Sequence, residues 1–276
     1  MQDRREEDFA VLWPLATARD TAGMTADWDA ATYDRVADPQ ARWGMTVLDR
    51  LPLRGDERVL DAGCGSGRVT QELVARLPRG HVIALDASAA MIEEARRRLA
   101  PVADRVSFIT AQLLRPIPIE RPVDAILSTA TCHWVLDHDL LFRNLAAVLQ
   151  PGGRLVAQCG GGNNVEVVLD AASGVMAEFG LDPAWRGPWY FATPDETRVR
   201  LEAAGFVDIE TWLNPEPTPL EPGDQLETFL ATVILRDHLA RLPEVDRPRF
   251  VRAVAARLPR PEIDYVRLNI VARRAD

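Results

Sequence analysis

The most constraining feature of the 276-residue chain is a glycine-rich turn that directly follows a short apolar run. The segment VLDAGCGSG spans Val59 to Gly67, with two further glycines at Gly63 and Gly65, and a helical pattern follows it. A strand, a bare turn and a helix N-terminus bring backbone N–H groups and the positive end of a helix dipole to one place. Glycine permits positive φ and lets a ligand approach the backbone closely. The segment therefore predicts a binding site at a strand-to-helix turn.

Short apolar runs alternate with helical patterns around this turn. Because strand–helix alternation is typical of a parallel sheet with helices on both faces, we predict a doubly wound α/β fold. The runs that predict buried strands are Arg58–Asp61, His81–Leu85, Val106–Thr110, Val123–Ser128 and Arg154–Gln158.

The regular alternation of strand and helix patterns ends after Gly160. One further strand is expected at Phe206–Leu213, with Val207, Ile209 and Thr211 on one side. The terminal YVRLNIVA alternates apolar and more polar residues, which predicts a half-buried strand, antiparallel at or near a sheet edge. We therefore expect a mostly parallel, seven-stranded sheet with a helical cap. The cap and lid segments are expected at about 26–50, 162–194 and 218–260, after an extension at 1–25 and within one domain at 26–276.

Composition excludes several classes of protein. The net charge is −9, so the chain lacks the excess positive charge that is typical of proteins that bind nucleic acid or an anionic membrane. The chain has no lysine, which excludes a lysine Schiff base and a P-loop lysine. Cys64, Cys132 and Cys159 have neither disulfide-framework nor zinc spacing and fit a reducing compartment. We expect a cytoplasmic protein without a metal site, acting on a small molecule; its oligomeric state stays open.

An acidic residue ends the second predicted strand and points to a nucleoside. Asp86 lies 19 residues after Gly67, where such folds place a carboxylate that accepts hydrogen bonds from ribose hydroxyls. A dinucleotide fold favours Gly-x-Gly-x-x-Gly, but here the third glycine comes one residue early. Asp61, just before the turn, suits an ammonium group better than a pyrophosphate. The residues favour a cationic amino-acid nucleoside over NAD.

Several segments around the glycine turn resemble those of a known family. VLDAGCGSG is similar to motif I of the class I S-adenosylmethionine (SAM)-dependent methyltransferases, and HVIALDAS to the acidic strand that follows it. VDAILSTATCHWVLDHDLLFRNLAAVLQPGGRLVAQ resembles their fourth strand, helix and fifth strand. The His-Trp and Asp-His elements, with DWDAATY upstream, are most similar to the branch around trans-aconitate methyltransferase.

The resemblance implies a site for SAM, with S-adenosylhomocysteine (SAH) as product. The cofactor-contacting residues that it implies are Asp61, Gly63, Gly65, Asp86, Ala87, Met91, Ala111, Gln112, Leu113, Ser128 and Ala130. The residues implied for the acceptor pocket are Trp28 and Tyr33 from an N-terminal lid, together with His133 and Trp134; Trp189 is a further candidate from its place in an aromatic segment.

The chain departs from the family pattern at two places. Gln112 stands where the family usually has an aspartate, and its amide can still accept from an adenine amino group. CGGGNN replaces the family's stretch after the fifth strand, so the namesake's substrate does not transfer to this chain.

The catalytic assignments leave alternatives open. His133 is the candidate general base, although a partly buried structural histidine is the more common case. Arg186, Arg236 and Arg241 are candidates to bind a substrate anion, although solvated surface arginines are common. The expected function is SAM-dependent methyl transfer to a small molecule, at a carboxylate or hydroxyl oxygen. The alternatives are a SAM-binding protein without methyl transfer and an NAD-dependent oxidoreductase.

Overall fold

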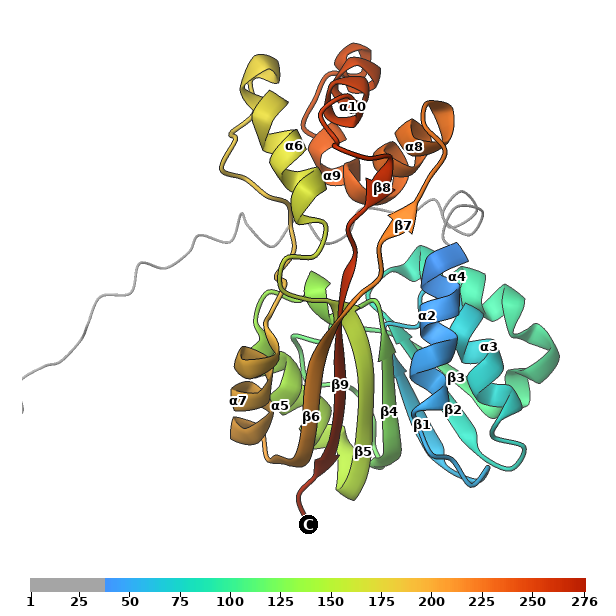
Figure 1. The fold of residues 1–276 in the computed structure, drawn as a ribbon. Coiled ribbons are helices and arrows are strands. Elements are labelled where there is room, and N and C mark those ends of the chain that lie inside the picture. Colours follow the sequence, from blue (N-terminus) through green and yellow to red (C-terminus); the bar gives the residue numbers. More distant parts are fainter. Residues whose placement is uncertain (1–37) are drawn as a thin grey trace, which may run out of the picture.

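A seven-stranded sheet forms the centre of the computed structural model, which describes residues 38–276 (Figure 1). The predicted extension and the lid residues Trp28 and Tyr33 lie outside the described residues. The strand order is β3-β2-β1-β4-β5-β9-β6, and β1 to β5 are parallel, as predicted. The strands are β1 (Arg58–Ala62), β2 (His81–Asp86), β3 (Val106–Thr110), β4 (Val123–Thr129), β5 (Leu149–Gly160), β6 (Phe206–Pro215) and β9 (Val266–Arg274).

Helices cover both faces of the sheet. One apolar cluster joins α2, α3 and α4 to one face through residues such as Leu48, Leu73 and Ile92. A second cluster joins α5 and α7 to the other face, with Phe142 and Leu201 fully buried. The covering helices are α2 (Asp38–Asp49), α3 (Arg68–Ala75), α4 (Ala89–Arg98), α5 (His138–Val148) and α7 (Pro194–Ala203), with short 3-10 turns η2 (Ala100–Arg105) and η3 (Cys132–Trp134).

The last strand lies inside the sheet. β9 is antiparallel to β5 on one side and to β6 on the other, so β6 is the edge strand. Leu268 and Ile270 on β9 are buried, which makes this strand more buried than its sequence pattern predicted. In β6 the register shifts between Val207 and Glu210, where Asp208 has a φ of 52°. The expected alternation in β6 is therefore interrupted by a bulge.

A helical cap stands over the carboxyl ends of the parallel strands (Figure 1). It has its own apolar core, in which Val168, Phe229, Leu230 and Phe250 are buried. The cap elements are α6 (Glu166–Met176), η4 (Ala177–Phe179), β7 (Thr218–Pro219), α8 (Asp224–Phe229), the π-helical η5 (Leu230–Ile234), α9 (Arg236–Leu239), η6 (Glu244–Asp246), α10 (Arg247–Ala255) and β8 (Glu262–Ile263). They fall in the predicted segments 162–194 and 218–260, except that β8 lies just beyond the second. In the described part of the chain, no helix is long and apolar enough to cross a membrane.

A buried histidine in the cap core makes stability depend on pH. His238 is fully buried, and neither ring nitrogen has a hydrogen-bond partner among the described residues. Burial and the nearby Arg241 charge lower the pKa of His238 to about 4. Because an exposed imidazole titrates near 6.5, the unfolded chain binds more protons between about pH 6.5 and 4.

Stability should therefore fall as the pH falls through that range. The pKa difference corresponds to about 3 kcal/mol for His238. His238→Phe should remove this part of the pH dependence, which urea unfolding at pH 7.5, 6.0 and 5.0 would measure. Parallel curves for the wild type and His238→Phe would contradict the assignment.

Candidate active site

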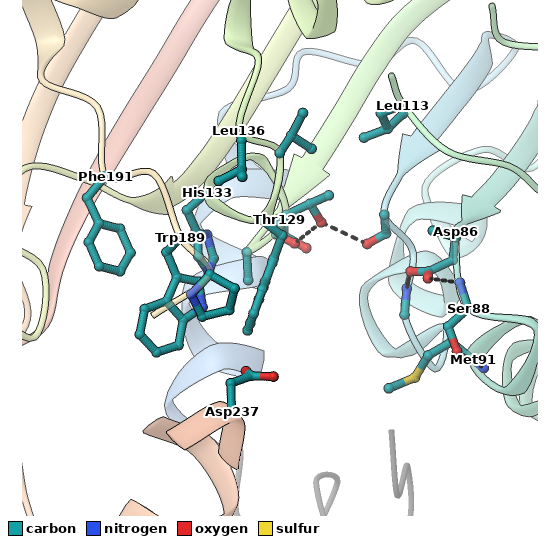
Figure 2. Close-up of a pocket in the computed structure, with 18 of the residues that line it drawn as sticks. Asp86, Ser88, Met91, Leu113, Thr129, His133, Leu136, Trp189, Phe191 and Asp237 are labelled. Atoms are coloured by element: carbon teal, nitrogen blue, oxygen red, sulfur yellow. Dashed lines mark hydrogen bonds between the residues drawn. The ribbon is translucent and has the colours of Figure 1, made fainter. Parts of the chain in front are cut away.

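A cavity of about 380 Å³ opens between the glycine turn after β1, the loops after β2 and β4, and the cap. In parallel α/β sheets ligands bind outside the carboxyl ends of the strands, where the strand order reverses. Here the order reverses between β1 and β4. Figure 2 shows two ends of the cavity: Asp86 and Met91 lie at one, and His133, Trp189 and Phe191 lie at the other.

Most of the predicted site residues line this one cavity. Those in the lining are Gly63, Gly65, Asp86, Ala87, Met91, Ala111, Gln112, Leu113, Ala130, His133, Trp134 and Trp189. Asp61 and Ser128 instead lie behind the lining, each about 1% exposed. The Ser128 hydroxyl donates to the Ala62 carbonyl at 2.7 Å, so it joins β4 to β1 beneath the site.

The glycine turn is held tightly on one side and is open on the other. The backbone N–H groups of Gly63 and Cys64 both donate to the Leu85 carbonyl, at 2.8 and 2.9 Å. A Cβ on Gly63 would lie 2.0 Å from Thr131 Oγ1, so a side chain there would clash with the loop after β4. A Cβ on Gly65 would meet no heavy atom within 4 Å. The turn thus leaves room at Gly65 for a ligand against the backbone.

Asp86 is oriented by the two loops that it joins. Its Oδ2 accepts from the Gly65 N–H and its Oδ1 from the Ser88 N–H, both at 2.9 Å. Burial raises the pKa of Asp86, and the backbone hydrogen bonds counteract that rise. Because a carboxylate oxygen has two lone pairs, each oxygen retains capacity for one more donor. The side chain lines the cavity and suits a pair of hydroxyl groups.

Asp61 is a buried carboxyl group under the turn. Its Oδ2 accepts from the Thr70 hydroxyl at 2.7 Å, and its Oδ1 has no hydrogen-bond partner within the described residues. The pKa of Asp61 is raised to about 7, mainly by burial; the Thr70 hydrogen bond opposes this rise and the nearby Asp86 charge adds to it. Two carboxyl groups therefore lie close to the glycine turn, an arrangement that a positively charged ligand would stabilise.

His133 at the other end of the cavity is buried and neutral. The Gly160 N–H donates to its Nδ1 at 3.3 Å. Burial lowers the pKa of His133 well below its usual range, and the charges of Arg267 and His138 lower it further. Because Nδ1 accepts a hydrogen bond, the single proton of the neutral ring is on Nε2. The His133 side chain therefore presents a donor.

Arg267 is brought to the same end by β9. In the antiparallel register Arg267 pairs with Gly160, and the Gly160 N–H donates a hydrogen bond to His133. The side chain is 3% exposed, lines the cavity and stacks over the Trp43 ring at 4.7 Å. The charge of a buried guanidinium is thus placed next to a neutral imidazole.

Two further charged residues enter the cavity from the cap. Arg236 and Asp237 at the start of α9 both line it, and their charged groups are 3.5 Å apart. Of the other candidate anion-binding residues, Arg186 forms ion pairs with Glu166 and Asp170, and Arg241 stacks over Trp185. Neither of them lines the cavity.

Comparisons with known proteins identify the family of this chain. A family model described as a methyltransferase domain matches residues 59–153. A trans-aconitate 2-methyltransferase of Paracidovorax citrulli is 30% identical over 90% of this chain and 99% of its own. The enzyme of that name from Variovorax paradoxus is 38% identical over 79% of this chain and 83% of its own.

The chain belongs to the class I SAM-dependent methyltransferases. Solved structures show the same fold. A phosphoethanolamine N-methyltransferase of Haemonchus contortus has a TM-score of 0.60 at 18% identity, covering 89% of this chain and 57% of its own. The YcgJ protein of Bacillus subtilis has a TM-score of 0.57 at 18% identity, covering 85% and 99%. The methyltransferase assignment takes the place of the two alternatives considered from the sequence.

The cavity residues fit SAM. The open side of Gly65 gives a ligand access to the backbone, and Asp86 has capacity for two ribose hydroxyls. The unpartnered Asp61 oxygen beneath the turn suits a cationic ligand. Within residues 38–276 no cluster of three or more His, Cys, Asp or Glu side chains is placed to hold a metal ion.

Several lining residues of the methyltransferase were missed by sequence reasoning. They include Thr131, Leu136, Asn164, Val165, Pro188, Phe191, Val233, Ile234, Asp237, Tyr265 and Arg267, and Arg236 was only one of three candidates. The terminal strand was recognised by its alternation, and Arg267 was counted among its polar positions. A single buried arginine in a strand has no local signal that separates it from a solvated one.

Proposed function

We propose that this methyltransferase transfers the methyl group to a carboxylate oxygen of a small organic acid, forming a methyl ester. Several relatives at 30% identity and above are named for trans-aconitate, which is a carboxylic acid. SAM supplies an electrophilic methyl group on a sulfonium centre. The residues of the chain have to hold the acceptor in line and exclude water.

The observation that carries the proposal is the hydrogen bond from the Gly160 N–H to His133 Nδ1. With Nδ1 accepting and Nε2 protonated, His133 has no free lone pair with which to take a proton. A hydroxyl or phenol acceptor needs such a base, whereas a carboxylic acid with a pKa near 4 is already ionised at neutral pH. The neutral His133 suits an acceptor that only needs a hydrogen-bond donor.

Arg267 supplies the charge that such an acceptor needs. Its guanidinium is buried beside His133, and a guanidinium matches carboxylate geometry with two parallel donors. Together, Arg267 and the Nε2–H of His133 form the proposed carboxylate site. At the opposite end we assign Asp86 to the ribose hydroxyls and Met91, Gln112 and Leu113 to the adenine.

The product test separates an ester from an ether. The full chain would be incubated with methyl-labelled SAM and trans-aconitate, and then with small monocarboxylic acids and phenols. Methyl esters release labelled methanol in mild alkali, whereas methyl ethers do not. Alkali-labile product from acids supports the proposal, and alkali-stable product from phenols alone would overturn it.

The role of His133 predicts a split between kcat and KM. With an acid acceptor, His133→Ala should raise KM about tenfold, since a hydrogen bond to a charged group contributes about 1.5 kcal/mol. It should lower kcat by less than about tenfold, because no proton transfer is lost. His133→Gln keeps a hydrogen-bond donor, so its KM should lie between those of His133→Ala and the wild type.

At saturating SAM, the pH profile of kcat for the wild type should show no inflection from His133 near pH 6.5, because the His133 pKa lies well below that value. A hundredfold loss of kcat in His133→Ala, with loss of an inflection near pH 6.5, would instead identify His133 as a general base.

A further inference from the structure

The acceptor end of the cavity holds few charges. Among the described residues that line this end, the cations are Arg236 and Arg267, and the anion is Asp237. Asp237 lies 3.5 Å from Arg236 and offsets much of its charge. A second or third carboxylate on the acceptor would meet no further cation among these described residues, and an unpaired buried charge is costly.

One wall of this end is aromatic. The rings of Trp134 and Trp189 are 5.6 Å apart, and those of Trp189 and Phe191 are stacked at 5.8 Å with planes 17° apart. His133 continues the row, with its ring 5.9 Å from that of Phe191 (Figure 2). All four side chains line the cavity. The wall is a continuous apolar surface that ends at the proposed carboxylate site.

Other apolar residues complete this end of the cavity. Val233 and Ile234 come from the π-helical turn η5 of the cap, and Pro188 comes from the loop before α7. Leu136 also lines the cavity and is 61% exposed. These residues add to the apolar lining, which is typical of small-molecule sites.

From the charges and the wall together we propose that the acceptor is an acid with one carboxylate and a flat or branched apolar body. The carboxylate would lie at Arg267 and His133, and the body would lie against Trp134, Trp189 and Phe191. This inference rests on the proposed carboxyl methylation. A tricarboxylate such as trans-aconitate would place further charges against indole and aliphatic surfaces, where desolvation is costly.

Three related acids test the proposal with the full-length protein. Crotonate, cinnamate and trans-aconitate all contain an unsaturated acid: crotonate ends in a methyl group, cinnamate has a phenyl ring, and trans-aconitate has two more carboxylates. Their affinities would be measured by calorimetry on the SAH-loaded protein, and their kcat/KM values with SAM. Burial of the phenyl ring should make cinnamate about 30-fold better than crotonate. Trans-aconitate should be the weakest of the three.

A matched pair of tryptophan variants locates the apolar body. Trp189→Ala should remove most of the preference for cinnamate over crotonate while leaving the affinity for SAH unchanged. Trp185 is the control, because it lies four residues earlier, contacts His238 at a ring distance of 4.7 Å and does not line the cavity. Trp185→Ala should keep the preference. Thermal unfolding of both variants would verify that they fold.

The outcomes separate this inference from the proposed function. If trans-aconitate is esterified with a kcat/KM equal to or above that of cinnamate, the inference is overturned and carboxyl methylation stands. If cinnamyl alcohol is methylated and cinnamate is not, carboxyl methylation is overturned, although an apolar acceptor body remains. If none of the acids binds to the SAH complex or is methylated, both fail. Equal affinities for cinnamate in Trp189→Ala and the wild type would overturn the position of the body.

Discussion

Arg267→Met is expected to lower kcat/KM for an acid acceptor by about 150-fold, with little change in affinity for SAH. Removing one partner of a buried, hydrogen-bonded charge pair costs about 3 kcal/mol. Methionine keeps much of the apolar stem that packs near Trp43, over which the guanidinium stacks. Calorimetry with SAH, steady-state kinetics with the acid and thermal unfolding together measure the effect.

Two further substitutions control for a structural role of Arg267. Arg267→Lys keeps the charge but loses the planar fork, so it should recover part of the activity. Arg236→Met removes an arginine whose charge Asp237 already offsets, and it should cost less than Arg267→Met. If Arg236→Met costs more, or if Arg267→Met leaves kcat/KM unchanged, the carboxylate site has been placed at the wrong arginine.

Asp86→Ala is expected to weaken SAM and SAH binding by about 100-fold. A carboxylate that accepts from two ribose hydroxyls gains about 1.5 kcal/mol from each, and the loss of about 3 kcal/mol corresponds to that factor. Because SAM and SAH have the same ribose, both should lose affinity to a similar degree. Calorimetry with each ligand measures this directly.

Asp86 also has a structural role in the glycine turn, so a second variant is needed as a control. Asp86 accepts hydrogen bonds from the Gly65 and Ser88 N–H groups, so alanine also loosens the glycine turn. Asp86→Asn keeps a similar shape and one carbonyl acceptor, so it should lose less affinity and less thermal stability than Asp86→Ala. Unchanged affinity for both ligands in Asp86→Ala would remove this residue from the cofactor site.

The sequence alone determined the parallel sheet and brought together the residues at the glycine-turn end of the cavity. Gly63, Gly65, Asp86 and Met91 lie within one short stretch of chain, and local signals describe them: a turn that needs glycine, an acid at a strand end and a helix with one apolar face. Parallel strands place all their carboxyl ends at one edge of the sheet. The strand assignments therefore sufficed to bring these residues together.

The position of Asp61 shows where such reasoning stops. The motif places Asp61 at the end of a strand, but alternation decides which side of the sheet its carboxyl group faces. In the structure it lies behind the cavity lining and bonds to Thr70 on α3. The sequence predicted that Asp61 contacts the cofactor, but it carries no signal that separates a residue in the cavity lining from one that lies beneath the turn.

Only the tertiary structure decided which residues form the proposed acceptor end of the cavity. Arg267 reaches His133 because β9 is inserted between β5 and β6 and pairs Arg267 with Gly160. Trp189 and Phe191 join the same wall because the Tyr190 N–H donates to the His133 carbonyl at 2.9 Å. Strand order, register and the docking of a cap loop depend on contacts between segments far apart in the chain. Local periodicity carries no information about such contacts.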